Sequence, residues 1–264
     1  VSSKHPLRTL SGAGVAYKVI EAVSRAMNRP EVAAQQLDLV ALGLVADVAD
    51  LVNDTRYLTQ MGLSHLRLTE RPGFREVYRN AQVNPMLLNE EHIGFQIGPR
   101  LNAIGRLSDA NPIVELMTSQ DPGVFSVIAT QLEGLNSRRK LLTDQVLKSA
   151  LELIERSPDL AESPAVILSQ PNWLGGVVGI VAGRLVELFG KPAILLNSKP
   201  DGTSSGSARS VDGVNIIEAI SNASHLLNGF GGHPMAAGMS LQTADLPKFR
   251  QLIYEAVAKQ LEGK

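Results

Sequence analysis

Residues 165–197 read AVILSQPNWLGGVVGIVAGRLVELFGKPAILLN, and this stretch decides the fold class of the second half of the chain. Two short aliphatic runs, 165–169 and 192–197, flank a helical pattern that begins on glycines. A strand, a helix and a second strand in this order form a βαβ unit, whose two strands lie parallel in one sheet. We therefore predict an α/β domain built around this unit.

The glycines at the start of that helix do not form a dinucleotide-binding fingerprint. Their spacing is not G-x-G-x-x-G, and Leu195 lies about where the ribose-binding carboxylate should fall. The sequence also contains no H-E-x-x-H zinc-protease motif, no G-x-S-x-G nucleophile elbow and no cysteine. By itself, the sequence therefore holds no complete catalytic set.

Helical patterns account for most of the remaining chain. Helices are expected over residues 12–27, 37–51, 55–68, 214–227 and 244–263. In the first of these helices, Val15, Ile20 and Val23 share the apolar face. A further helix over 122–157 begins at an Asp-Pro N-cap, is well above average length, and is expected to connect the two halves of the chain.

Composition limits the class of protein. With 264 residues, two domains are expected, and 44% hydrophobic and 19% charged residues are typical of an ordinary soluble globular protein. No apolar run approaches the roughly 20 residues of a membrane span, so we expect no membrane contact. The lack of cysteine suits a reducing cytoplasm. The net charge of −1 restricts any nucleic-acid contact to a local basic groove.

Aspartates interrupt the apolar run 37–51. Asp47 has nearly all-apolar neighbours, and a buried carboxylate is strongly unfavourable unless it is paired or bound to a metal. Asp47 is therefore either such a buried group or a helix-end residue that caps a neighbouring element. Asp38 and Asp50 are interpreted as a helix N-terminal charge and a surface charge.

Basic residues occur in two groups. Arg100 and Arg106 lie six positions apart beside glycines in GPRLNAIGRL, within a segment (94–112) that we expect to be an ordered loop around a short helix. The two arginines can clamp phosphates through bidentate hydrogen bonds, or they can brace the loop by bonding carbonyls. The basic run at 138–140 on the long helix is either a solvated face or a track for a nucleic-acid backbone.

A serine-rich segment follows the βαβ unit. In residues 201–210, DGTSSGSARS, the side chains of Ser205, Ser207 and Arg209 can form a phosphate cradle. The alternative is a loop or a serine-rich edge strand with no ligand.

The segment GFGGHPMAAGMSL, residues 229–241, gathers small side chains around one histidine. It is either a tight turn that feeds a close-packed helix, or a concave nest. In the nest, the backbone N–H groups of Gly231 and Gly232 and the ring of His233 would face a phosphate.

Five of these motifs occur together in a known order. VALGLVADVADL, IGPRLNAIGRL, the tryptophan-led start of the glycine-rich helix, GSARS and FGGHPMAAG resemble the RecJ single-strand-specific 5′→3′ DNA exonucleases of the DHH/DHHA1 phosphoesterase superfamily. The resemblance covers nearly the whole chain and implies an α/β fold in three parts. These are the helical C-terminal part of a DHH domain over 1–120, a connecting helix over 121–158, and an α/β DHHA1 substrate-binding domain over 159–264.

The resemblance also implies site residues. Asp47 matches the last aspartate of a family ligand set that holds two Mn²⁺ or Mg²⁺ ions, with the remaining ligands expected upstream of residue 1. His233 would neutralise phosphate charge during cleavage. The residues implied to bind substrate are Arg100, Arg106, Ser207, Arg209, Gly231 and Gly232, and we add Ser205 from the phosphate-cradle interpretation of the serine-rich segment.

Two departures from the family pattern stand out. Leu174 replaces a frequent histidine and Asp50 a frequent proline. The Asp-His-His triplet and the C-terminal OB fold of the family have no counterpart in this sequence, so the chain is expected to be inactive alone. The implied partners are single-stranded DNA, a single-strand-binding protein and a helicase, in DNA repair and recombination. Alternatives are a phosphodiesterase for short oligonucleotides or cyclic dinucleotides, and a non-catalytic nucleic-acid-binding module.

Overall fold

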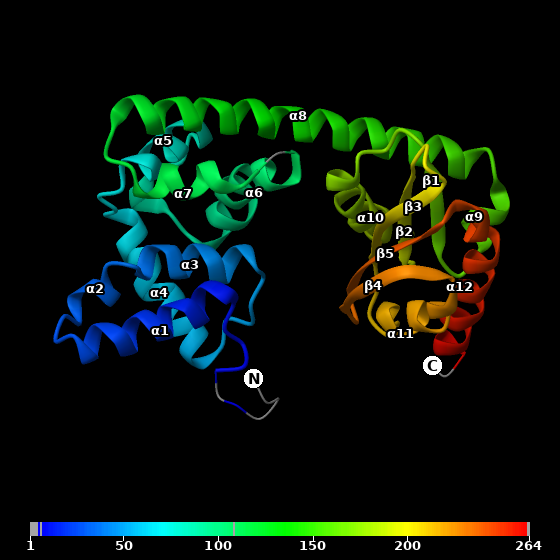
Figure 1. Cartoon of the computed structure of the whole chain (residues 1–264), viewed down its shortest axis with the longest axis horizontal. Helices are drawn as coiled ribbons and strands as arrows, with labels where there is room; N and C mark the ends of the chain where they lie inside the picture. The colour runs from blue at the N-terminus through cyan, green and yellow to red at the C-terminus, as the bar shows by residue number, and fades with distance from the viewer. Residues whose placement is uncertain (1–4, 6, 108, 263–264) are drawn as a thin grey trace. The chain divides into compact units, whose positions relative to one another are not determined.

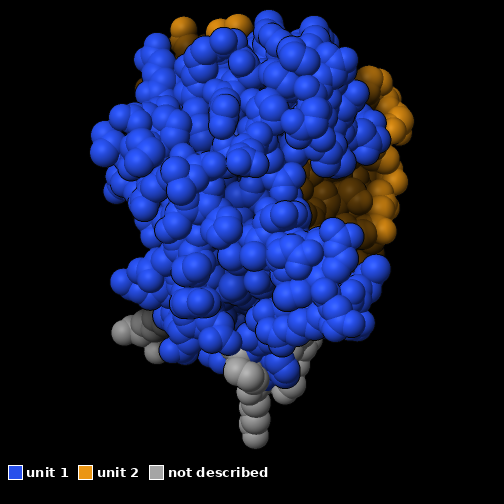
Figure 2. Space-filling view, turned by 90° about the vertical axis from the view of Figure 1, so that its left-hand side faces the viewer, with its two compact units in different colours: residues 1–137 blue, residues 138–264 orange. Residues whose placement is uncertain are grey.

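The computed structural model describes residue 5 and residues 7–107 and 109–262 (Figure 1). The chain divides into two compact units, residues 1–137 and 138–264, coloured blue and orange in Figure 2. Each unit has its own hydrophobic core. Within the described ranges, no helix has both the length and the apolar character that crossing a membrane requires.

Unit 1 is helical. Its elements are α1 (Gly12–Ala26), α2 (Glu31–Ala34), α3 (Leu37–Ala46), α4 (Asn53–Arg67), α5 (Pro72–Ala81), the 3-10 helix η1 (Pro85–Leu87), the π-helix η2 (His92–Ile97), α6 (Gly98–Leu107) and α7 (Asn111–Thr118). The absence of a side chain at Gly62 allows helices α3 and α4 to approach closely. A Cβ at this position would lie 2.2 Å from the Leu37 carbonyl oxygen. The core of unit 1 therefore depends on small residues as well as on Phe74 and Leu116, which are fully buried.

Of the apolar face predicted for the first helix, only Ile20 packs against the core, and the prediction is wrong for Val15 and Val23. Val15 and Val23 are 47% and 51% exposed, whereas Gly14, Tyr17 and Ser24 are buried. Helix α1 packs through its small side chains: a Cβ at Gly43 of α3 would lie 2.3 Å from the Cβ of Ala13. Close packing of backbones has therefore overridden the hydrophobic pattern.

The ordered loop predicted around a short helix in 94–112 is only partly right. The short helix is present as α6, but η2 continues directly into it where a loop was expected, and α7 begins at Asn111. Ile93, Ile97, Leu101 and Ile104 are buried along this stretch at near-helical spacing. Burial of these four side chains outweighs the turn-forming composition of the segment. The predicted helix over 37–51 is real but ends at Ala46.

Helix α8 (Pro122–Glu155) is continuous over 34 residues, which confirms the predicted long helix. Its backbone has no break at Gly134, and the predicted N-cap Asp121 accepts a hydrogen bond from the Gly123 N–H at 2.8 Å. Apolar residues of α8 belong to the cores of both units: Ile128 and Leu132 in unit 1, and Val146, Ala150 and Ile154 in unit 2. In the basic run, Arg138 and Lys140 are exposed, whereas Arg139 is half-buried.

Unit 2 contains a five-stranded sheet in the order β1-β2-β3-β5-β4. The strands are β1 (Val166–Gln170), β2 (Ala193–Ser198), β3 (Thr203–Arg209), β4 (Leu227–His233) and β5 (Ala236–Gln242). The helices are α9 (Pro158–Glu162), α10 (Gly175–Phe189), α11 (Ile216–Ser221), α12 (Leu246–Leu261) and the 3-10 turns η3 (Ser224–Leu226) and η4 (Thr243–Asp245). Strands β1 and β2 are parallel around α10, which confirms the βαβ unit.

Helices cover the two faces of this sheet unequally. One face packs on α11 and α12 through Ile194, Ala208 and Met239. On the other face, α10 and α8 cover β1 and β2 through Leu168 and Leu195. In Figure 1, α10 lies on one side of the sheet and α12 on the other.

Two further expectations for unit 2 need correction. Residues 201–210 contain β3, which is an interior strand between β2 and β5 rather than an edge strand or a loop. Residues 229–241 form most of the β4–β5 hairpin, with no helix after the turn. The expected helix over 214–227 consists of α11 followed by η3, and the final helix is confirmed as α12.

Candidate functional site

Strand pairing gathers the serine-rich and histidine-containing motifs on one face of the sheet. Residues paired directly across neighbouring strands project to the same side. The pairings define three rows across β3, β5 and β4: Arg209–Ala236–His233, Ser207–Gly238–Gly231 and Ser205–Ser240–Gly229. We call these nine residues the small-residue face.

The small-residue face is accessible. All nine residues are half-buried or exposed, whereas the alternate residues Ser204, Ala208, Ala237 and Met239 are buried on the other side of the sheet. The hydroxyls of Ser205 and Ser207 have no hydrogen-bond partner among the described residues. They are therefore available to a ligand.

Helix α10 borders this face. A Cβ at Gly179 would lie 3.0 Å from Arg209 Nη2 and 3.2 Å from Ser207 Oγ, so the missing side chain leaves space for both groups. Arg209 Nη1 donates a hydrogen bond to the Ala208 carbonyl at 2.8 Å. The sheet backbone and α10 thus hold the guanidinium beside the Ser207 hydroxyl.

His233 ends β4 at the hairpin turn and is exposed. Its Nδ1 accepts a hydrogen bond from the Met235 N–H at 3.4 Å, so in the neutral ring the proton is on Nε2. The turn itself is held by two backbone bonds, from Ser210 N–H to the Met235 carbonyl and from Ile216 N–H to the Pro234 carbonyl, both 3.0 Å. The site therefore presents an Nε2–H donor on a fixed turn.

The two predicted binding glycines have different structural roles. Gly232 has φ of +155°, and a Cβ there would lie 2.3 Å from the Ala236 carbonyl oxygen, so the hairpin itself requires glycine. A Cβ at Gly231 would meet nothing within 4 Å. Gly231 keeps the small-residue face open without being needed for packing.

Asp47 lies in unit 1 as the C-cap residue of α3 and is exposed. It is thus at a helix end, but its carboxylate has no described hydrogen bond or ion pair and caps no neighbouring element. The next residue, Val48, has φ of 54° and is 88% exposed, a strained conformation for a β-branched side chain. The described residues contain no cluster of three or more potential metal ligands, so Asp47 stands alone here.

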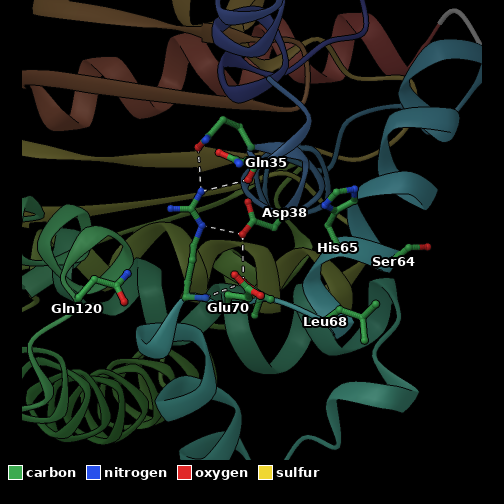
Figure 3. A pocket seen from close by; sticks show the side chains of 10 residues that line it. Gln35, Asp38, Ser64, His65, Leu68, Glu70 and Gln120 are labelled. Atoms are coloured by element: carbon green, nitrogen blue, oxygen red, sulfur yellow. Dashed lines mark hydrogen bonds and ion pairs between the residues drawn. The ribbon is translucent and has the colours of Figure 1, made fainter. Parts of the chain in front are cut away.

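Asp38, interpreted from the sequence as a helix N-terminal charge, does lie in the first turn of α3, but it is buried. It is 4% exposed and accepts hydrogen bonds from Arg71 Nε at 2.7 Å and from the Thr69 hydroxyl at 3.3 Å. Arg71 also donates to the Met117 carbonyl at 3.1 Å, which ties α3 to α7. This ion pair lines a polar cavity of about 730 Å³ that contains no predicted site residue (Figure 3).

Arg100 and Arg106 point in different directions from α6, since six positions correspond to about 600°, or 120° between side chains. Arg100 pairs with Glu133 of α8 at 2.8 Å and donates to the Gln96 carbonyl at 2.7 Å. This is the bracing role that the sequence left open.

Arg106 lines a largely apolar cavity of about 660 Å³ together with Ala46, the residue before Asp47. The residue keeps an exposed surface, but partial burial of the guanidinium lowers the pKa of Arg106. In unit 1 the structure therefore associates Arg106, rather than Arg100, with the end of α3.

Comparison with known proteins follows the same division of the chain. Residues 162–259 match the model of the DHHA1 domain. The whole chain is similar to the single-stranded-DNA-specific exonuclease RecJ of Bacillus subtilis, with 37% identity over 95% of this chain and 31% of the relative. It is also similar to RecJ of Escherichia coli, with 37% identity over 97% of this chain and 48% of the relative.

A solved structure agrees with these similarities. RecJ of Thermus thermophilus in complex with Mn²⁺ superposes with a TM-score of 0.83 at 29% identity, covering 94% of this chain and 36% of that chain. The chain thus spans between about a third and a half of the length of these relatives. Residues 162–259 thus match a DHHA1 domain, and the chain is similar over most of its length to a part of the RecJ exonucleases.

Proposed function

We propose that this chain is part of a metal-dependent phosphodiesterase that removes nucleotides from the 5′ end of single-stranded DNA in repair and recombination. The relatives named as single-stranded-DNA-specific exonucleases support the substrate class. The observation that carries the proposal is the small-residue face, where strand pairing gathers Ser207, Arg209 and His233 on an accessible surface.

The small-residue face suits a phosphodiester. Its serines and glycines allow the sugar-phosphate backbone to approach the sheet closely, and the unbonded hydroxyls of Ser205 and Ser207 can donate to phosphate oxygens. Arg209 and His233 are two strands apart, about 10 Å, with only Ala236 between them. Both can therefore donate charge-assisted hydrogen bonds to one phosphate.

Asp47 is the proposed metal ligand in unit 1. Its exposed carboxylate has no described partner and is the hard oxygen donor that Mn²⁺ and Mg²⁺ prefer. Relatives have been crystallised with each of these ions. A pair of such ions would activate water and stabilise the leaving oxygen. The remaining ligands would come from the part of the family protein that this chain does not span, so the chain alone should be inactive.

The other groups have supporting roles in this proposal. Arg106 would contact the DNA path near Asp47, whereas Arg100 would hold α6 against Glu133. Gly232 would shape the hairpin, and Gly231 would leave room for the backbone. A single-strand-binding protein and a helicase remain predicted partners, and a cytoplasmic location remains a prediction.

Single-stranded DNA binding tests the proposal. In a fluorescence-anisotropy titration with a 5′-phosphorylated oligonucleotide, Arg209→Gln should weaken binding by about tenfold or more, the loss of one charge-assisted hydrogen bond. Asp144→Asn, an exposed residue of α8, is the matched control and should bind as the parent chain does. Equal affinity of the parent and Arg209→Gln chains would refute the assignment of this face.

Turnover tests the substrate class. In a version extended to the length of the relatives, polymeric single-stranded DNA should be degraded faster than a dinucleotide. Faster cleavage of a linear or cyclic dinucleotide would favour a small-substrate phosphodiesterase. Unimpaired DNA binding together with no Mn²⁺ affinity at Asp47 would favour a non-catalytic binding module.

A further inference from the structure

A second polar site in unit 2 lies away from the small-residue face. A cavity of about 440 Å³ opens between α9, the carboxyl end of β1 and α12. Its lining includes Asp159, Leu160, Ser169, Arg250 and Tyr254. None of these residues belongs to the three rows described above.

Two polar atoms at this cavity are buried without a partner. Arg250 and Tyr254 are four positions apart on α12 and therefore share one helix face. Arg250 Nε and the Tyr254 hydroxyl are both inaccessible to solvent and have no hydrogen-bond partner among the described residues. A buried N–H or O–H group without an acceptor is unfavourable, so an acceptor bound in the cavity would be stabilised by these two donors.

A chain of hydroxyl groups ends at the same cavity. Ser169 Oγ lies 2.6 Å from Ser198 Oγ, which lies 3.0 Å from Ser204 Oγ, which lies 2.9 Å from Thr243 Oγ1. Three bonds use three of the four hydroxyl hydrogens, so one hydroxyl keeps a hydrogen to donate. An acceptor in the cavity would orient the four hydroxyl groups so that Ser169 donates to the acceptor, and each hydrogen bond in the row would polarise the next.

We propose that this cavity binds a compact oxyanion, either inorganic phosphate or a phosphate monoester. Arg250 Nε, the Tyr254 hydroxyl and the Ser169 hydroxyl supply the donors. Arg250 is half-buried and has no ion pair with any described carboxylate, so an anion in the cavity would supply both an acceptor and a partner for its charge. An anion satisfies both the hydrogen bonds and the charge.

Substitution of Asp159 tests whether the ligand of this cavity is an anion or a cation. Its exposed carboxylate lies on the lining of the cavity and repels an anion. Replacing it by asparagine removes a negative charge and keeps the shape. Asp159→Asn should therefore tighten anion binding, whereas it would weaken the binding of a cation.

The experiment is a titration of the 264-residue chain with inorganic phosphate at constant ionic strength, followed by NMR. The Arg250 Nε–H signal and the Leu160 methyl signals should shift and saturate. By the methyl signals, Arg250→Gln should weaken the affinity by about tenfold or more, the loss of one charge-assisted bond. Tyr254→Phe and Ser169→Ala should each weaken it less, and these variants keep the test valid if Arg250→Gln does not fold.

Arg209→Gln is the control that separates this cavity from the small-residue face, and it should leave the Leu160 shifts unchanged. A second titration uses adenosine 5′-monophosphate. If this monoester binds more tightly than inorganic phosphate does, the ligand is a phosphate monoester; if it binds equally or more weakly, the ligand is inorganic phosphate. The proposal is overturned if the Arg250 signal does not saturate, if Arg250→Gln, Tyr254→Phe and Ser169→Ala all bind like the parent chain, or if Asp159→Asn weakens binding.

Discussion

The two neighbouring glycines of β4 should respond to substitution in opposite ways. Gly232→Ala places a Cβ 2.3 Å from the Ala236 carbonyl oxygen at a φ of +155°, so the hairpin must distort. Backbone strain of about 1–3 kcal/mol and overpacking of about 1–3 kcal/mol together predict a loss of roughly 2–6 kcal/mol in unfolding free energy. At roughly 2–4 °C per kcal/mol, the Tm of unit 2 should fall by about 4–24 °C.

Gly231→Val should leave stability nearly unchanged, because its Cβ would meet nothing within 4 Å. Surface changes of this kind stay within about 0.5 kcal/mol. The isopropyl group would, however, project from the small-residue face and keep a phosphate from the neighbouring donors. Losing one charge-assisted hydrogen bond of about 1.5–3 kcal/mol should weaken single-stranded DNA binding by roughly 10- to 150-fold.

The assay combines calorimetric Tm with anisotropy binding on the same preparations. Asn228→Val, on the same exposed edge strand but outside the three rows, is the matched control and should change neither quantity. The reasoning is refuted if Gly231→Val binds DNA like the parent chain, or if it lowers Tm as much as Gly232→Ala does.

Four further outcomes are expected. Asp38→Ala leaves the Arg71 charge partly buried without its partner and should lower the free energy of unfolding, measured in urea, by about 3–5 kcal/mol. Asp144→Ala removes an exposed ion pair and should lower it by less than about 1 kcal/mol. In a version extended to the length of the relatives, Asp47→Ala should abolish turnover at unchanged Tm, since its carboxylate is exposed and has no described partner. In the same extended protein, His233→Ala should slow cleavage by about one to two orders of magnitude without lowering Tm, because one charge-assisted bond is lost; a lower Tm at an unchanged rate would assign it a structural role. Burial raises the pKa of Tyr78 above its ordinary value of 10.0, so the unfolded chain loses the phenol proton at a lower pH than the folded chain does. The free energy of unfolding should therefore fall as pH rises above 10.0. Tyr78→Phe should reduce this fall in unfolding titrations.

Much of the architecture could be predicted from the sequence, because the responsible signals are local. The βαβ unit and α8 carry strong periodicity and clear capping residues, and both are present as expected. The segment 94–112 shows where such signals fail. Its glycines and asparagines indicate an ordered loop around a short helix, yet the burial of Ile97 and Leu101 accompanies helical structure that begins before that helix.

The candidate site depended more on tertiary structure. Short motifs in the sequence identified Ser205, Ser207, Arg209 and His233, but not that β5 lies between β3 and β4 and joins them in rows. The alternation of buried Ala237, Met239 and Leu241 with smaller residues was the available signal for that strand. It was weak because small side chains give little contrast in polarity between the two faces of a strand.

The sequence by itself determined which local elements form, since periodicity, caps and turn residues act over a few positions. Only the tertiary structure decided which charge is buried. Asp38 and Asp47 lie nine positions apart in one apolar run, yet Asp38 meets Arg71 from the start of α5 and Asp47 faces solvent. The free energy of a carboxylate depends on the distant groups and the solvent around it rather than on its chain neighbours, and those surroundings exist only after the helices have packed.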